Sequence, residues 1–319
     1  MATYKEIRGV NIQSLEADPT AVEGDVWYNS SSGKLRMYAA VGSWSTNGDI
    51  NQGRYAGGSG TEAPGTAGLI FAGEAPDYDN TETYDGSTWT EVNNLNTARG
   101  NLAGAGTQTA GLCAGGSVSP QGQSEEFDGT NWAEGNDLNT ARAGLTGNGP
   151  QTASLSTGGK IGENFQTLNE LYNGSSWSEA GDLNTARAYH TTAGDSTAGL
   201  AAGGSSPYTV NSEEFNGSSW TEGNNLNAAK AYIMGGFGTQ TASLVCGGYS
   251  PSGTFATTEQ YDGTSWTEVG DLPTATRHHF GSGSTSAGLA AGGRSAPGST
   301  LTEGYEWLEA ASAETVAFD

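Results

Sequence analysis

The chain is organised around Tyr84-Asp85-Gly86-Ser87-Thr88-Trp89-Thr90-Glu91, a segment that runs on to Leu95-Asn96-Thr97-Ala98-Arg99 and returns throughout the sequence. Its copies share an aromatic residue, an Asp-Gly or Asn-Gly pair, a tryptophan, a leucine and a basic residue, and their tryptophans are Trp132, Trp177, Trp220 and Trp266. Trp44 leads into Arg54 in the same way, and from Trp44 onward the tryptophans lie 45, 43, 45, 43 and 46 residues apart. A period of this size indicates an array of identical supersecondary units.

The composition predicts an all-β protein. The 319 residues include 51 glycines and many Thr, Ser, Asn and Asp residues, which is typical of short strands joined by tight turns. A repeat array of this length can form one body. The formal net charge of −23 argues against a nucleic-acid partner, because phosphate binding requires a basic face. We expect no membrane insertion and no secretion signal, because no run approaches the ~18 apolar residues of a membrane span and the N-terminus lacks the apolar core of a signal peptide.

Each repeat contains four strand candidates. The first is glycine-rich and follows the basic residue, the second is apolar and ends in small residues, the third carries a glutamate two residues before the aromatic, and the fourth carries the tryptophan. The third and fourth are joined by Asp-Gly or Asn-Gly, which favours a tight hairpin turn. The glutamates of the third strands are Glu82, Glu125, Glu170, Glu213, Glu259 and Glu303.

Four antiparallel strands of this kind cannot bury both faces alone, so neighbouring sheets must stack, and radial stacking gives a β-propeller. The strand pattern, the double glycine that closes the second strand and the Leu-(Asn/Pro)-Thr-Ala-Arg segment resemble the kelch repeat over residues 53–305. Two features depart from that family. Asp-Gly or Asn-Gly replaces its common Tyr-Asp-Pro turn, and Ala72-Gly73-Glu74 stands at the first double glycine.

The chain ends decide the number of blades. In the last repeat Trp307 follows the aromatic Tyr305 by two residues instead of five, so its fourth strand is irregular. We predict six blades, with residues 42–48 closing the last blade as a clasp between the chain ends. A seventh blade built from residues 24–48 is the alternative, and residues 314–318 are another candidate for the last outer strand.

The sequence before the propeller predicts a separate attachment region. Residues 1–20 indicate an extended arm, and Gly24-Asp25-Val26-Trp27-Tyr28-Asn29 with Lys34-Leu35-Arg36-Met37-Tyr38 predicts a β-hairpin around a Gly-containing turn. This hairpin resembles short segments of bacteriophage tail and virion proteins. We therefore divide the chain into an arm (1–20), the hairpin plus closing outer strand (21–52) and the kelch-like propeller (53–319).

Enzymatic chemistry is not expected, and neither is a cofactor. The three histidines, His190, His278 and His279, have no metal-ligand spacing and no nucleophile with an acid partner nearby in the sequence. Cys113 and Cys246 lie in apolar strand segments and predict buried thiols. The repeated tryptophans should pack between blades. The glutamates two residues after them should face solvent and oppose edge-to-edge aggregation.

Basic residues predict a ring around the propeller axis. One cation stands at the entry to each innermost strand, namely Arg54, Arg99, Arg142, Arg187, Lys230 and Arg277. The six third-strand glutamates should lie beside them, so one structural ion pair per blade is the favoured interpretation. An anion or acidic-glycan site at the channel mouth is the functional alternative.

The loops between second and third strands vary among the repeats, and they share one face with the loops that join successive blades. Variable loops on a constant scaffold often carry recognition. Aromatic candidates for ligand binding there are Tyr78, Phe165, Tyr208, Tyr249 and Phe255. We expect no metal site, and the one weak Ca²⁺ candidate is Asp77 with Asp79.

Together these features predict a non-enzymatic bacteriophage virion protein, assembled in the host cytoplasm. In this hypothesis the arm and hairpin bind other virion proteins, and the propeller loops of a tail fibre or appendage bind a host surface glycan or protein. A homo-oligomer is compatible with this role. The alternative is an architectural protein that decorates or braces the tail, neck or capsid.

Overall fold

The computed structural model describes residues 13–16, 26–117, 122–205 and 207–315. The chain forms two compact units, one of residues 1–43 with 309–319 and one of residues 44–308. None of the described segments forms a helix long and apolar enough to cross a membrane.

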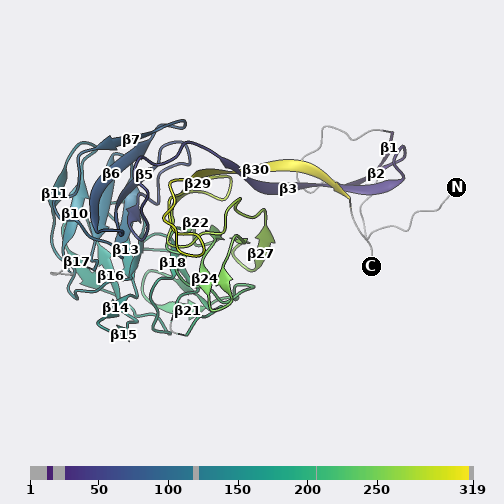
Figure 1. Cartoon of the computed structure of the whole chain (residues 1–319). Coiled ribbons are helices and arrows are strands. Elements are labelled where there is room, and N and C mark those ends of the chain that lie inside the picture. Colours follow the sequence, from purple (N-terminus) through teal and green to yellow (C-terminus); the bar gives the residue numbers. More distant parts are fainter. Residues whose placement is uncertain (1–12, 17–25, 118–121, 206, 316–319) are drawn as a thin grey trace. The chain divides into compact units, whose positions relative to one another are not determined.

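The second unit is a six-bladed β-propeller built from four-stranded antiparallel blades (Figure 1). Blade one contains β4 (Gly58–Ser59), β5 (Leu69–Gly73), β6 (Tyr78–Tyr84) and β7 (Trp89–Val92). Blade two contains β8 (Ala103–Thr107), β9 (Ala110–Ala114), β10 (Ser124–Phe127) and β11 (Trp132–Glu134). Blade three contains β12 (Thr146–Asn148), β13 (Ser154–Thr157), β16 (Asn169–Tyr172) and β17 (Trp177–Glu179), with the loop hairpin β14 (Lys160–Ile161) and β15 (Asn164–Phe165).

The remaining blades repeat this order. Blade four contains β18 (Thr191–Gly194), β19 (Gly199–Ala202), β20 (Ser212–Phe215) and β21 (Trp220–Glu222). Blade five contains β22 (Phe237–Thr239), β23 (Ala242–Cys246), β26 (Thr258–Tyr261) and β27 (Trp266–Val269), with the loop hairpin β24 (Tyr249–Ser250) and β25 (Gly253–Thr254). Blade six contains β28 (Phe280–Gly283), β29 (Ala287–Ala291), the start of β30 (Gly304–Thr315) and the end of β3 (Lys34–Thr46).

The predicted clasp closes blade six. Strand β3 lies beside β30 in the sheet, so the outer strand with Trp44 comes from the N-terminal side and the inner three strands come from the C-terminal side. The Asn47 N–H continues this pairing by donating to the Gly304 carbonyl at 2.9 Å. Closure in this way completes the ring of blades and leaves only short outer edges. The seventh blade and the outer strand from residues 314–318 are therefore wrong, and residues 316–318 lie outside the described part.

The first unit contains the predicted hairpin. Strand β2 (Val26–Asn29) pairs antiparallel with β3, and β1 (Gln13–Leu15) pairs parallel with β2. Gly33, in the turn between β2 and β3, has a φ of 69°, a conformation that favours glycine. Most of the predicted arm, residues 1–12 and 17–20, and the hairpin residues Gly24 and Asp25 lie outside the described residues.

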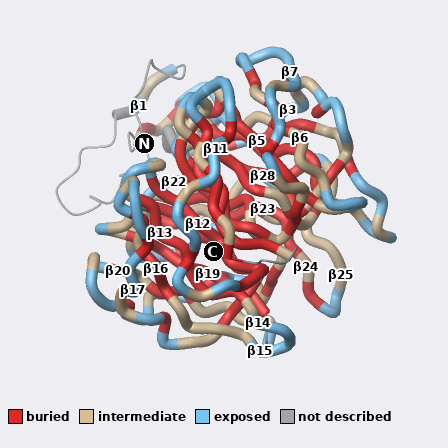
Figure 2. The backbone as a smooth tube through the Cα atoms, turned by 90° about the vertical axis from the view of Figure 1, so that its left-hand side faces the viewer, coloured by how far each residue is buried: buried red, intermediate tan, exposed pale blue. Residues whose placement is uncertain are grey.

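Apolar burial is concentrated between the blades. Each hydrophobic cluster combines residues of two adjacent blades, as when Leu69 and Phe71 of blade one meet Phe127 and Trp132 of blade two. Each repeat tryptophan is 5–8% exposed, as predicted, and the glutamates that follow them are exposed. Figure 2 shows the result: inner strands are buried and the outermost turns are exposed. Burial of one such large side chain stabilises the fold by about 2–3 kcal/mol.

The hairpin between third and fourth strands is longer than the sequence pattern suggests. Tyr84 pairs with Trp89, so four residues form the turn, and only Gly86 has positive φ, at 93°. The Asp85 carboxylate accepts the backbone N–H groups of Ser87 and Thr88 at 2.9 Å. The Asp side chain therefore organises this turn by accepting hydrogen bonds, as Asx turns do.

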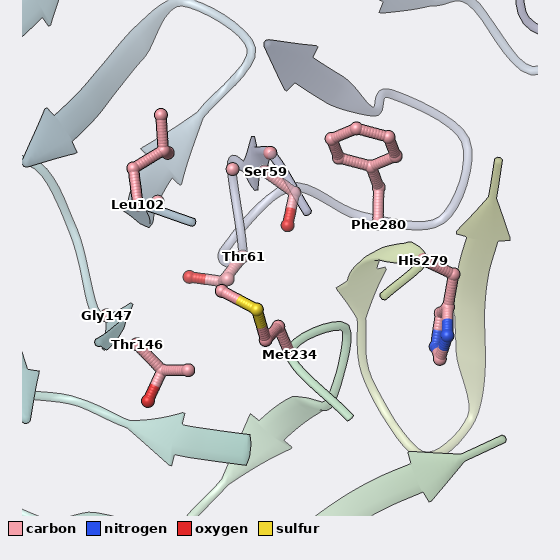
Figure 3. Close-up of a pocket in the computed structure, with 11 residues that line it drawn as sticks. Ser59, Thr61, Leu102, Thr146, Gly147, Met234, His279 and Phe280 are labelled. Atoms are coloured by element: carbon pink, nitrogen blue, oxygen red, sulfur yellow. The ribbon is translucent and has the colours of Figure 1, made fainter. Parts of the chain in front are cut away.

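The axis of the propeller is filled. Glycines on the innermost strands allow close backbone approach: a Cβ on Gly104 would lie 2.4 Å from the Ser59 nitrogen. Figure 3 shows Thr61, Met234 and Ser59 converging at the centre, and the space between the lining side chains is about 10 Å³. That is room for about one water molecule. The interior of the axis therefore has no room for a ligand larger than about one water molecule.

Candidate functional site

Five of the six predicted ring cations form buried ion pairs with the third-strand glutamate of their own blade. Arg99 to Glu125 is 3.0 Å, Arg187 to Glu213 is 2.5 Å and Lys230 to Glu259 is 2.7 Å. The other two pairs are Arg54 with Glu82 and Arg142 with Glu170. The cation side chains are at most 1% exposed, so they are not accessible to an external anion.

Each of these glutamates has a second set of donors. An asparagine three residues before the cation donates its backbone N–H to the other carboxylate oxygen, as Asn96 does to Glu125 at 2.7 Å. The same bond occurs at Asn51, Asn139, Asn184 and Asn227. Burial lowers the pKa of Arg142, and the Glu170 carboxylate opposes that shift. Removal of either partner would leave the other charge buried without compensation.

Blade six has no such pair, and two sequence assignments are corrected here. The register of β29 with β30 places Tyr305, not Glu303, at the glutamate position, and Trp307 at the third-strand aromatic position. In the other blades the second glycine of the double-glycine turn donates to the carbonyl of the next blade's cation. Gly248 donates instead to Thr276 at 2.8 Å, so Thr276 occupies the cation position and Arg277 lies one residue beyond it.

The physical reason is a substitution. Thr276 follows Leu272 by four residues, as Arg99 follows Leu95, and Arg277 stands at the next position, where blade two has Gly100. Pro273 also replaces the asparagine and provides no N–H. Blade six thus combines three neutral residues where the other blades hold Asn, Arg and Glu.

A closed circle of backbone hydrogen bonds surrounds the propeller axis, close to the cation positions. Two residues after each cation position, the chain adopts the left-handed conformation, with φ between 53° and 66°. The N–H of each such residue donates to the carbonyl of its counterpart in the preceding blade, at 2.6–2.9 Å. The six residues are Ala56, Asn101, Gly144, Tyr189, Tyr232 and His278. Five of them are not glycine, which makes this a constrained and constant platform.

Aromatic rings gather on one side of this platform. The centroids of Tyr189 and Tyr232 are 4.8 Å apart, and those of Tyr232 and His278 are 4.4 Å apart. Tyr55 adds a ring 5.6 Å from His278. The loop of blade five brings Tyr249 to 6.1 Å from Tyr232, and Tyr208 lies 6.1 Å from Tyr249. We call these six residues the mouth cluster: Tyr55, Tyr189, Tyr208, Tyr232, Tyr249 and His278.

Three basic side chains lie over rings of the mouth cluster. The Arg277 guanidinium is 4.4 Å from the Tyr249 centroid, Arg294 is 4.7 Å from Tyr55, and the Lys160 ammonium is 5.8 Å from Tyr189. We call these three residues the rim cations. Within the described part of the chain, none of them forms an ion pair with a carboxylate.

A depression adjoins the mouth cluster at blades two and three. It has a volume of about 230 Å³ and is lined by Asn101, Ser117, Ala143, Lys160, Gly162 and Tyr189. The Asn101 amide donates to the Glu74 carboxylate, which fixes its orientation. An amide, a hydroxyl, an ammonium group and an aromatic ring therefore surround one small space.

Only part of the predicted aromatic set belongs to this arrangement. Tyr208 and Tyr249 do. The Tyr78 hydroxyl instead donates to the Ala75 carbonyl at 2.9 Å, and Phe255 lies 5.9 Å from the buried Lys230 ammonium. Phe165 lies in the short hairpin of blade three and is half-buried.

The weak Ca²⁺ candidate does not form a cluster. Asp79 accepts a hydrogen bond from Asn94 at 3.4 Å. No group of three or more His, Cys, Asp or Glu residues suited to a metal ion occurs among the described residues, Asp77 and Asp79 included.

The histidines and cysteines have structural environments. The His190 Nε2 lies 2.8 Å from both Thr146 and Thr157, and the His279 Nε2 lies 3.1 Å from the Cys246 sulfur. Burial lowers the pKa of His279 to about 4 and raises the pKa of Cys246 to about 12. A neutral imidazole beside a thiol is the stable form of this pair, and the thiol is not activated. Both cysteines are free and buried, as predicted.

Sequence reasoning missed most of the mouth cluster. Tyr189, Tyr232 and His278 were not candidates, and neither were Tyr55, Lys160 and Arg294. A signal for three of them exists in the repeats: the second residue after the cation position varies among the blades, being Ala, Asn, Gly, Tyr, Tyr and His in chain order. Only the circle of six left-handed residues in the structure shows why that position faces the mouth of the propeller axis.

These features define a class of fold, the six-bladed β-propeller, here with kelch-like repeats. Among solved structures, the chain is similar to one described as "Structure of YjhT", with a TM-score of 0.65 and 13% identity over 80% of this chain and 95% of that chain. This similarity shows the fold alone. No family model matches the sequence. No curated protein matches it either.

Proposed function

We propose that this protein is a non-enzymatic binding propeller of a bacteriophage virion, which contacts a host surface glycan or protein through the face that carries the mouth cluster. The observation that carries the proposal is the gathering of six aromatic side chains and three unpaired cations at one mouth of a filled axis. Aromatic side chains provide large contact areas with little loss of conformational freedom, which suits recognition.

The first unit is proposed as the attachment region. Its hairpin has the sequence that resembles bacteriophage virion segments, and β3 and β30 connect it to blade six through two strands of 13 and 12 residues. The proposed partners of this unit are other virion proteins, and the site of action is the assembled particle.

An architectural role is the second candidate. It is favoured by the same long β3 and β30 strands, because a propeller can brace a tail, neck or capsid without binding a host. In that case the mouth cluster would bind a neighbouring virion protein.

Immunogold imaging of particles tests the proposal. A label on this protein at the distal end of the tail supports host contact, and a label on the neck or capsid favours the architectural role. Purified protein should also compete with particles for adsorption to host cells. A particle population that lacks the protein and adsorbs and assembles normally would contradict both roles.

A further inference from the structure

We infer that the mouth cluster and the adjoining depression bind a saccharide that carries carboxylate groups, with the rim cations Lys160, Arg277 and Arg294 contacting the carboxylates. This inference rests on the proposed binding function and names the chemical class of its ligand. It differs from the acidic-glycan site considered for the ring cations, because those cations are buried and paired.

The distribution of positive charge is the first argument. The propeller unit contains eight Lys and Arg residues, and five of them are buried in ion pairs with glutamates. The other three are the rim cations, and all three lie on the mouth cluster. On a chain of net charge −23, an exposed basic residue would readily find a carboxylate partner. The concentration of the unpaired cations at one place therefore indicates an anionic ligand.

The geometry of the cations is the second argument. A guanidinium that stacks on an aromatic ring keeps its plane fixed, and those of its edge N–H groups that have no protein partner remain available for a carboxylate. The Arg277 Nε is buried without a hydrogen-bond partner in the described part of the chain. Arg294 uses two nitrogens to donate to the Gly298 carbonyl, at 3.2 and 3.1 Å, which holds it over Tyr55. Both side chains are thus placed before any ligand arrives.

The depression is the third argument, and it favours a sugar over other anions. Its lining combines the Tyr189 ring with the Asn101 amide, the Ser117 hydroxyl and the Lys160 ammonium. An aromatic ring packs on the C–H face of a pyranose, while amide and hydroxyl groups bond its hydroxyls. A nucleic acid is disfavoured, because its evenly spaced phosphates would meet the negative charge of the rest of the propeller.

The test uses glycan binding by the full-length protein at about 0.15 M NaCl, where the Debye length of about 8 Å screens long-range repulsion. The probes are oligomers of galacturonate, glucuronate and mannuronate, each compared with its carboxyl-reduced neutral form. We expect at least one acidic oligomer to bind, with its reduced form bound at least about tenfold more weakly. The triple variant Lys160→Gln, Arg277→Gln, Arg294→Gln should lose at least the same factor.

Two controls separate binding from folding. Lys34→Gln removes an exposed cation of the first unit and should leave binding unchanged. Tyr189→Asn with Tyr232→Asn removes two rings while keeping a residue type that tolerates the left-handed conformation, as Asn101 already does in blade two. Both variants should keep the melting temperature of the parent, and only the double tyrosine variant should lose acidic-oligomer binding.

Several outcomes would overturn the inference: no binding of any acidic oligomer, equal binding of the reduced forms, or tighter binding of poly-glutamate than of every oligomer. In these cases the proposed function still stands if the purified protein competes with particles for adsorption. Conversely, glycan binding by a protein that is labelled only on the neck or capsid would refute host contact and leave the ligand class intact.

Discussion

Blades one to five and blade six have the same strand arrangement but different residues at the entry to the innermost strand. In the first five, a buried cation, a glutamate and an asparagine form a hydrogen-bonded group at the entry to the innermost strand. In blade six, Thr276, Tyr305 and Pro273 occupy those places, and the sheet is still complete. A buried ion pair contributes little net stability compared with neutral side chains of matching shape. The difference shows that the blade does not require the charge, and the arginine next to the cation position, Arg277, lies on the mouth cluster instead.

The largest expected effect comes from breaking one pair of the first five blades. Arg142→Ala should lower the free energy of unfolding by about 3–5 kcal/mol, because it leaves Glu170 buried without its charge partner. Urea unfolding of the purified protein measures this change. Arg277→Ala is the matched control and should change stability by less than about 0.5 kcal/mol. Similar losses for the two variants would contradict the distinction between the blades.

Acid should destabilise the protein through its histidines, and two of these, His278 and His279, belong to blade six. Burial lowers the pKa of His279 to about 4 and that of His278 to about 3, and it lowers the pKa of His190. The unfolded chain takes up protons near pH 6.5 while the folded protein does not, so stability is complete above that pH and falls as pH decreases toward 4. Each histidine contributes up to about 1.4 kcal/mol per pH unit.

Thermal unfolding between pH 7 and pH 5 measures this dependence. His279→Ile copies the residue that blade five holds at the same position, Ile233, and should remove about one third of the slope. A slope that His279→Ile leaves unchanged would show that other groups titrate in this range.

A smaller effect on stability is expected at the interfaces between adjacent blades, which alternate between two kinds of contact. The hydroxyls of Tyr84, Tyr172 and Tyr261 bond Glu306, Glu126 and Glu214 of the preceding blade, whereas Phe215 packs on Leu171. Tyr172→Phe should cost about 1–2 kcal/mol, because Glu126 loses a hydrogen bond to its charged group. Adding Glu126→Leu should restore most of the loss. Calorimetric unfolding of the single and double variants distinguishes this coupling from a simple packing defect.

The smallest effect on stability should accompany the largest effect on binding. Tyr208→Ala with Tyr249→Ala removes two rings of the mouth cluster and should change the melting temperature by less than about 2 °C, because neither ring lies between blades. The affinity for the acidic oligomer that the parent protein binds should fall at least about tenfold. Tyr78→Ala is the control, since Tyr78 lies outside the cluster, and an equal loss in that variant would relocate the site.

The sequence by itself determined the repeat, the strand order within each blade, the clasp at Trp44 and the ion pairs of blades one to five. These follow from local periodicity, because side-chain burial on a strand has a short and regular period. It did not determine the register of the last blade. Glu303 has the same spacing to Tyr305 as the true members have to their aromatics, and only strand pairing with β29 shows that it lies two residues out of place.

Tertiary structure alone decided the mouth cluster. Its rings come from blades one, four, five and six, which are far apart in the sequence, and they meet because six left-handed residues form a closed circle of hydrogen bonds around the axis. That circle exists only after the propeller closes, so no local pattern encodes it. The same closure brings Arg277 onto Tyr249 and Arg294 onto Tyr55, and it makes both arginines part of a candidate binding site.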